Sequence, residues 1–186
     1  MKSEKEKMLA GELYNALDTQ LTEERTKARL FIKELNDSRE DQPEERSRIL
    51  KSLLPNAREG LWIQPPFYCD YGYNINIGER VFFNFNCVVL DVAQVTIGDR
   101  TLLGPNVQVY TATHPMYAEQ RAGGLEYAKP VSIGNDVWIG GSAVICPGVT
   151  IGDRSVIGAG SVVTKDIPPD VFAAGNPCRV IRSIEQ

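Results

Sequence analysis

The chain has 186 residues, of which 42% are hydrophobic and 24% are charged, and its formal net charge at pH 7 is -4. These values indicate one soluble globular domain, or one with a small appendage, and argue against nucleic acid as a partner, because such a surface needs a basic stripe. No apolar run approaches the length of a membrane span, and the charged N-terminal stretch MKSEKEKMLAGELY lacks the apolar core of a signal peptide. We therefore expect a cytoplasmic protein with no membrane partner.

Residues 1–57 form a predicted N-terminal helical segment. Ser3 and Glu6 have the spacing of a capping box, and apolar residues then recur at helical intervals as far as Leu17. Thr22 is the expected cap of a second helix, and Pro43 stands where a third helix would begin. Residues 58–74 contain two consecutive prolines among many aromatic side chains, so we interpret them as a connector.

Residues 75–168 follow a pattern with a period of six. Its clearest part has aliphatic residues at intervals of six, most of them followed by a small residue: Ile133, Ile139, Ile145, Ile151, Ile157 and Val163. This period fits neither an amphipathic helix nor an alternating strand. It predicts a mainly β fold, a parallel β-helix in which each hexad forms one short strand and one turn and three hexads complete a triangular coil. Stacked coils would supply the stability, and residues 169–186 form a C-terminal segment.

The hexad pattern breaks over residues 111–130, which we interpret as a loop inserted into the coil. This loop contains His114, the only histidine in the chain. Because the unperturbed pKa of imidazole lies near neutrality, His114 is a candidate general base. Glu126, in the same loop, is a candidate partner for the second ring nitrogen, and a backbone carbonyl would serve as well.

The cysteines do not indicate a metal site. Cys69, Cys87, Cys146 and Cys178 lie far apart, no pair has CxxC spacing, and one histidine cannot complete a usual zinc set. We predict that no metal is required and that the cysteines are small, mostly buried thiols.

Motifs spread over essentially the whole chain resemble a known family. They are CDYGYNINIG, NFNCVVLDV, YTATHP, IGNDVWIGG, ICPGVTIGDRSVIGAGSVVTKDIP and AAGNPCRVIR, together with the N-terminal EKEKMLAGELYNA. They are similar to the sugar O-acetyltransferase branch of the left-handed β-helix acyltransferases, which includes the maltose, galactoside and nodulation acetyltransferases. The resemblance implies a left-handed coil, acetyl-CoA as co-substrate, and a homotrimer with active sites between subunits. It also implies direct acetyl transfer to a sugar hydroxyl, with an acceptor of the maltose or glucose type.

The resemblance assigns roles to single residues in catalysis and in coenzyme A binding. His114 matches the catalytic base of the family, and the backbone N–H of Gly141 matches the oxyanion donor, although some relatives have serine there. Trp138 and Gly141 would line the cleft that holds coenzyme A. The other positions implied for coenzyme A are Ala159, Thr164, Lys165, Arg179 and Arg182, and the basic side chains among them suit its phosphates.

The resemblance also places polar residues around the sugar. Asp70, Asn84 and Asp91 stand where relatives contact the acceptor, and Tyr14 and Asp18 of the N-terminal segment are expected to close this site. The galactoside branch has serine in place of Asp70, tyrosine in place of Phe82 and a second aspartate in place of Val92. These departures favour the maltose branch.

Other functions use the same fold. A galactoside, another glycan or an antibiotic of the streptogramin group are alternative acceptors, although the N-terminal helices and the CDYGYN motif favour a sugar. A γ-type carbonic anhydrase needs three histidines, and the chain has one. A non-catalytic scaffold would need neither His114 nor an intact WIGG motif.

Overall fold

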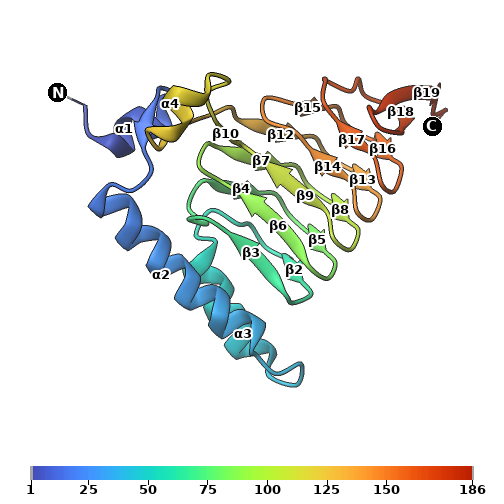
Figure 1. Cartoon of the computed structure of the whole chain (residues 1–186). Coiled ribbons are helices and arrows are strands. Elements are labelled where there is room, and N and C mark those ends of the chain that lie inside the picture. Colours follow the sequence, from blue (N-terminus) through green and yellow to red (C-terminus); the bar gives the residue numbers. More distant parts are fainter. Residues whose placement is uncertain (1, 186) are drawn as a thin grey trace.

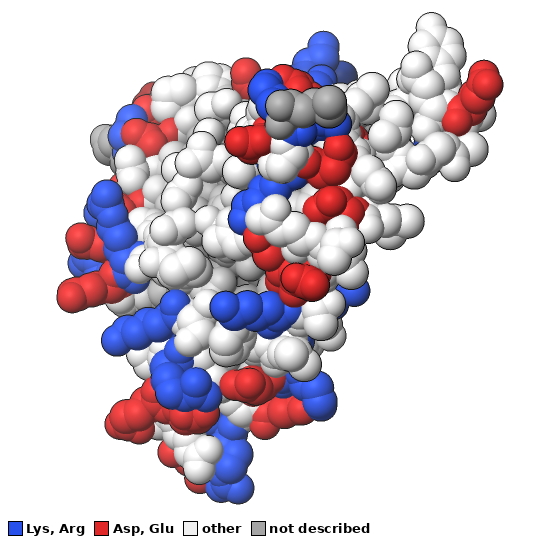
Figure 2. All heavy atoms as spheres, turned by 90° about the vertical axis from the view of Figure 1, so that its left-hand side faces the viewer, with Lys and Arg blue, Asp and Glu red and all other residues white. Residues whose placement is uncertain are grey.

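A computed structural model describes residues 2–185 of the chain (Figure 1). Three helices come first in the sequence: α1 (Glu4–Leu9), α2 (Thr19–Asn36) and α3 (Pro43–Leu53). On the side of the molecule that carries them, acidic and basic side chains are intermixed (Figure 2). No helix within residues 2–185 is long and apolar enough to cross a membrane.

The helix starts agree in part with the sequence patterns. The predicted capping box of α1 is confirmed, because the Ser3 hydroxyl accepts from Glu6 N–H and the Glu6 carboxylate accepts from Ser3 N–H. Pro43 occupies the first turn of α3, as predicted. The prediction of Thr22 as the cap of α2 was wrong: Asp18, an equally good capping residue one turn earlier, accepts from Leu21 N–H.

The rest of the chain winds into a triangular parallel β-helix, which confirms the predicted fold class. Face I contains β4 (Ile75–Ile77), β7 (Val95–Ile97), β12 (Val131–Ile133) and β15 (Thr150–Ile151). Face II contains β2 (Trp62–Ile63), β5 (Phe82–Phe83), β8 (Leu102–Leu103), β13 (Trp138–Ile139), β16 (Val156–Ile157) and β18 (Val171–Ala174), with the antiparallel β19 (Arg179–Ser183) at its end. Face III contains β3 (Phe67–Cys69), β6 (Cys87–Leu90), β9 (Gln108–Tyr110), β14 (Val144–Ile145) and β17 (Val162–Val163).

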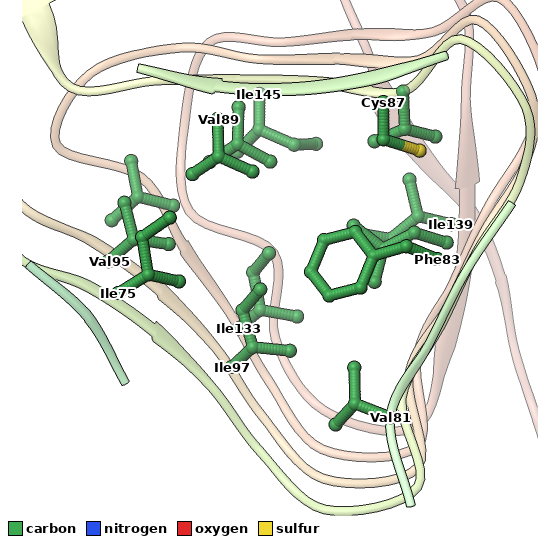
Figure 3. Packing of buried hydrophobic residues seen from close by; sticks show 14 of the residues in the cluster. Ile75, Val81, Phe83, Cys87, Val89, Val95, Ile97, Ile133, Ile139 and Ile145 are labelled. Carbon is green, nitrogen blue, oxygen red and sulfur yellow. The ribbon is translucent and has the colours of Figure 1, made fainter. Parts of the chain in front are cut away.

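The predicted aliphatic positions of the hexads form the core. Along each face the strands of successive coils pair in register, for example Ile97 with Ile133 and Ile133 with Ile151. The six aliphatic residues used to predict the repeat are at most 2% exposed. Figure 3 shows equivalent side chains of neighbouring coils stacked within the triangle. Each such side chain contributes about 1.5–3 kcal/mol through burial.

The small residue after each aliphatic position is required by close packing between coils. A Cβ atom added at Gly140 would lie 2.5 Å from the backbone nitrogen of Ala159 in the next coil. At Gly134 it would lie 2.7 Å from the nitrogen of Asp153. Neither glycine has a positive φ angle. These two positions therefore require glycine because two backbones approach each other, and not because of their dihedral angles.

The coil is longer than the hexad pattern indicates. Trp62 pairs with Phe82 and Phe67 with Cys87, so β2 and β3 form coil strands inside the predicted connector, residues 58–74. Within the predicted C-terminal segment, β18 pairs in parallel with β16. The aromatic and proline-rich stretch around Pro65 lacks the Ile-Gly signature, which is why the first coil was not visible in the sequence.

The inserted loop leaves the coil after β9 and returns at β12. It contains β10 (Ala112–Thr113), α4 (Ala118–Ala122) and β11 (Leu125–Ala128). On one side β11 pairs with β10, and on the other with β1 (Tyr14–Asn15) of the N-terminal segment, antiparallel in both cases. Residues 10–18, which the apolar pattern assigned to a helix, instead form this strand and its flanks. The N-terminal segment is thereby attached to the loop.

Candidate active site

His114 directly follows β10 and is exposed. Its Nδ1 atom lies 3.4 Å from the carbonyl oxygen of Leu125 on β11. When Nδ1 carries the proton and donates it to this carbonyl, the lone pair of Nε2 is available to accept a proton from a substrate. His114 is thus a candidate general base, and the backbone carbonyl of Leu125 is the group that would orient it.

Glu126, the neighbour of Leu125, has a different partner. Its Oε2 accepts a hydrogen bond from the Tyr14 hydroxyl at 2.8 Å. Burial and the adjacent carboxylate raise the pKa of Tyr14 well above its usual range, so this hydroxyl stays protonated and donates. Of the two partners that the sequence left open for the second ring nitrogen, the backbone carbonyl faces His114.

Asp91 lies beneath the site instead of lining it. Its side chain is fully buried, and its carboxylate accepts from the backbone N–H groups of Asp70, Tyr71 and Gly72 at 2.8–2.9 Å. Burial raises the pKa of Asp91 to about 6, against the effect of these hydrogen bonds. A buried carboxylate with three donors cannot also reach a sugar. Asp91 thus differs from its expected role, and it orders the turn that presents Asp70.

Asp70 is the acidic group that this turn exposes. It is half-buried after β3, and no group within residues 2–185 donates a hydrogen bond to its carboxylate. Burial raises its pKa, Arg25 lowers it and Glu126 raises it, so the three charges share one region. Arg25 itself donates to the Tyr71 hydroxyl at 2.7 Å and to the Ala16 carbonyl at 2.6 Å. Nothing in the sequence distinguishes Arg25 from the other charged residues of its helix.

Tyr14 and Asp18 serve structural contacts in the N-terminal segment. Tyr14 is fully buried, with its hydroxyl on Glu126, and Asp18 caps α2 through its carboxylate. Tyr14 lies near enough to Asp70 for that carboxylate to raise its pKa, but its full burial leaves no surface for a ligand. Only Asp18, half-buried, keeps part of its side chain accessible.

A second group of predicted residues lies at another corner of the triangle. Asp70 and Asp91 follow strands of face III, at the corner between faces III and I, and the loop that carries His114 leaves the coil at the same corner. Asn84, Gly141 and Ala159 follow strands of face II, at the corner between faces II and III. In Figure 1 the loop with β10 and α4 lies to the left of the coil, and β13 lies to the right. One chain therefore does not bring His114 and Gly141 together.

Gly141 and Trp138 have the exposure that their predicted roles need. No group within residues 2–185 accepts a hydrogen bond from the Gly141 N–H, so it is free to bind an oxyanion. The Trp138 side chain is 55% exposed on face II, between Leu102 and Val156 in the register. In the next coil, Gly160 N–H donates a hydrogen bond to the Gly141 carbonyl. This hydrogen bond places the exposed Ala159 next to Gly141. The side-chain oxygen of Asn84 accepts a hydrogen bond from Phe85 N–H, so the amide nitrogen of the same side chain is left for another partner.

The basic residues predicted for coenzyme A lie toward the C-terminal end of the coil. Arg179 and Arg182 are exposed on β19, where Arg182 lies over the Phe172 ring and Arg179 donates to the Cys178 carbonyl. Thr164 and Lys165 are exposed after β17, at the corner from which the inserted loop also emerges. These four residues thus also lie in two separate places, at the end of face II and at the corner between faces III and I.

Comparisons with known proteins agree with this architecture. The family model described as "Maltose acetyltransferase hexapeptide capping motif" matches residues 7–57, and "Bacterial transferase hexapeptide (six repeats)" matches residues 130–165. Galactoside O-acetyltransferase of Escherichia coli (strain K12) is 48% identical over 179 residues, which is 96% of this chain and 88% of that protein.

Two solved structures superpose closely on the chain. The crystal structure of a maltose O-acetyltransferase from Clostridium difficile 630 has a TM-score of 0.97 at 50% identity, covering 100% of this chain and 99% of the other. A galactoside acetyltransferase in complex with coenzyme A has a TM-score of 0.96 at 46% identity, covering 100% and 92%. At such identities the chain resembles these two proteins in amino-acid sequence as well as in fold.

Proposed function

The chain belongs to the family of hexapeptide-repeat sugar O-acetyltransferases, and from this membership and its geometry we propose that it transfers the acetyl group of acetyl-CoA to a hydroxyl of a maltose- or glucose-type sugar. The observation that carries the proposal is His114, whose Nδ1 faces the Leu125 carbonyl and whose Nε2 is left to act as a base. The relatives of known structure include a complex with coenzyme A.

The reaction needs one base and one oxyanion donor. Nε2 of His114 takes the proton from the sugar hydroxyl as the hydroxyl oxygen attacks the thioester carbon. The resulting oxyanion accepts a hydrogen bond from the Gly141 N–H. The carbon–sulfur bond then breaks, and the imidazolium returns its proton to the coenzyme A thiolate. A base contributes roughly 10²–10⁴-fold and one oxyanion donor roughly 10²–10³-fold to the rate.

We further propose that the site forms between subunits of a homotrimer. His114 and Gly141 lie at different corners of one chain, so a ternary complex needs the loop of one subunit beside face II of the next. Face II has an outward row of large apolar side chains that supports such packing: Trp62, Phe82, Leu102, Trp138, Val156 and Phe172. Trp62 and Leu102 are 47% and 46% exposed in the single chain. Contiguous exposed apolar surface of this kind is typical of an interface.

On the sugar side, we propose that the free carboxylate of Asp70 accepts hydrogen bonds from acceptor hydroxyls. Asn84 would add its amide from the neighbouring subunit, and Glu126 and Arg25 would set the charge of the cleft. Direct transfer, acceptor identity and the cytoplasmic location stay predictions. A galactoside acceptor is the main alternative, because the E. coli relative is named for that substrate.

The test is an acceptor screen combined with variants of the base. Purified chain is incubated with acetyl-CoA and maltose, glucose, galactosides or oligosaccharides, and thiol release and acetylated product are measured. His114→Ala and His114→Asn should lower kcat by roughly 10²–10⁴-fold, with an unchanged melting temperature because the side chain is exposed. Gln120→Ala, an exposed change in the same loop, is the control. Full activity of both His114 variants would overturn the assignment, and an acetyl-enzyme trapped without acceptor would overturn direct transfer.

A further inference from the structure

Tyr14 links the N-terminal segment to the loop that carries the base. Its side chain is fully buried in a small second cluster of apolar residues that includes Met8, Leu21 and Ala128. It is the direct cross-strand partner of Glu126, and its hydroxyl donates to the Glu126 carboxylate at 2.8 Å. A tyrosine held on all sides by packing can fix the position of whatever its hydroxyl binds.

Within residues 2–185, this N-terminal strand is the only strand that pairs with the part of β11 facing His114. The pairing of β11 with β10 covers Ala128 and Tyr127 and ends there. Leu125 and Glu126 pair with Asn15 and Tyr14 of β1. The carbonyl that faces Nδ1 of His114 belongs to Leu125. The position of this carbonyl therefore depends on how β1 and β11 are joined.

We propose that Tyr14 is a positioning residue for the base: through Glu126 it holds β11 so that the Leu125 carbonyl keeps the proton of His114 on Nδ1. Nε2 is then unprotonated and directed to the acceptor. The proposal rests on the proposed function in that it takes His114 as the base. It gives the N-terminal segment a function in catalysis, which it exerts through the loop that carries His114.

The competing arrangement has the Glu126 carboxylate acting directly on the imidazole. The two arrangements respond differently to Glu126→Gln, which keeps an oxygen for the Tyr14 hydroxyl but removes the charge. If Glu126 only connects Tyr14 to β11, the pH profile of kcat is the same in the glutamine variant as in the original chain. If the carboxylate stabilises the imidazolium, kcat falls steeply and its pH profile shifts.

The chain offers a closely matched control for Tyr14→Phe. Tyr73 likewise donates its hydroxyl to a carboxylate, that of Glu24, at 2.6 Å, and it packs half-buried against the same cluster. Tyr73→Phe deletes the same hydroxyl group, and Tyr73 also binds the N-terminal helices, through Glu24. Tyr73 does not pair with β11. We expect Tyr14→Phe to lower kcat by roughly tenfold, because a small displacement of a catalytic group is costly, with KM for acetyl-CoA unchanged. Tyr73→Phe should keep the original kcat.

A double-mutant cycle tests the path through Glu126. Tyr14→Phe and Glu126→Ala should each lower kcat, and together they should lower it no further than the larger single effect, because both break the same link. Additive losses would contradict the proposed path. A kcat of Tyr14→Phe equal to that of Tyr73→Phe would overturn it.

Nuclear magnetic resonance gives a readout that needs no substrate. His114 is the only histidine in the chain, so the ring nitrogen shifts of the untagged protein report its tautomer without ambiguity. We expect the Nδ1–H tautomer in the original chain and in Tyr73→Phe, and a mixture with Nε2–H in Tyr14→Phe. An unchanged tautomer in Tyr14→Phe overturns the proposal. If Tyr14→Phe changes the tautomer but the original chain acetylates no sugar, the proposed function is overturned and the positioning role of Tyr14 is left intact.

Discussion

Asp91 and Asp70 are joined through the backbone: the buried carboxylate of Asp91 accepts the N–H of Asp70 at 2.9 Å, while the carboxylate of Asp70 receives no hydrogen bond within residues 2–185. One aspartate is thus occupied in ordering the turn and the other is left available by it. The same turn is completed by Tyr71 and Gly72, whose N–H groups also donate to Asp91. The acceptor side of the site therefore depends on a residue that no ligand can reach.

The first prediction concerns Asp91→Asn. An asparagine offers one oxygen where the turn needs acceptors for three N–H groups, so at least one buried donor loses its partner. We expect a stability loss of about 1–3 kcal/mol and, because Asp70 is less well placed, a rise in KM for the sugar of roughly three- to tenfold. Denaturant unfolding and steady-state kinetics measure the two effects.

The control for this variant is Asp99→Asn. Asp99 also accepts a backbone N–H from the preceding coil, that of Glu79 at 2.9 Å, but at the corner between faces I and II. It should affect stability without changing either KM. A sugar KM that stays the same in Asp91→Asn would show that the turn does not position Asp70.

The second prediction is the pH dependence of the contribution of Asp91 to stability. Burial raises the pKa of Asp91 from its ordinary value of 3.8 to about 6. Between these two values the folded chain holds a proton that the unfolded chain has released, so the contribution of Asp91 to stability decreases as the pH rises through about 6. The unfolding free energy of the original chain minus that of Asp91→Asn should be larger at pH 4.5 than at pH 7.5. The opposite order would mean that the three hydrogen bonds outweigh burial.

The repeat was predictable because each hexad carries its own signal. Ile133, Ile139 and Ile145 face the interior independently, so the period survives wherever the packing rule holds. In the first coil Ile63 keeps the inward position, but Gln64 follows it in place of glycine. On the next face the inward positions are filled by Phe67 and Cys69, so the Ile-Gly signature is absent although the stacking is the same.

The site was only partly predictable from the sequence. His114 was found because it is the only histidine and interrupts the repeat. The Leu125 carbonyl was not, since a backbone group has no residue signature. Asp91 was assigned to the sugar because it stands where relatives contact the acceptor, and sequence does not tell whether a corner residue points outward or supports the coil below. Such distinctions depend on hydrogen bonds between residues about twenty positions apart.

The third prediction concerns the two arginines of β19. Arg179 and Arg182 are exposed, and charge-assisted contacts with the phosphates of coenzyme A are the interactions they can supply. Arg179→Ala combined with Arg182→Ala should raise KM for acetyl-CoA by roughly tenfold and leave KM for the sugar unchanged. Arg39→Ala removes an exposed arginine from the helical segment and serves as the control. An effect confined to the sugar would contradict the assignment.

The fourth prediction follows from the separation of His114 and Gly141 on one chain. If each site takes the loop of one subunit and face II of the next, two inactive variants can restore each other. His114→Ala lacks the base, and Gly141→Pro lacks the N–H donor. When the two are unfolded together and refolded, about a quarter of the subunit boundaries of a random trimer combine an intact His114 with an intact Gly141.

The refolded mixture should therefore recover about a quarter of the original activity, whereas each variant refolded alone stays inactive. Light scattering coupled to size-exclusion chromatography should give three times the chain mass of 20.6 kDa for all samples. Trp138→Ala with a second apolar-to-polar change at Leu102 should shift this mass toward the monomer, because both side chains lie on the exposed row of face II. Trimers without recovery of activity in the mixture would place base and oxyanion donor in the same subunit, which the separation of the two corners argues against.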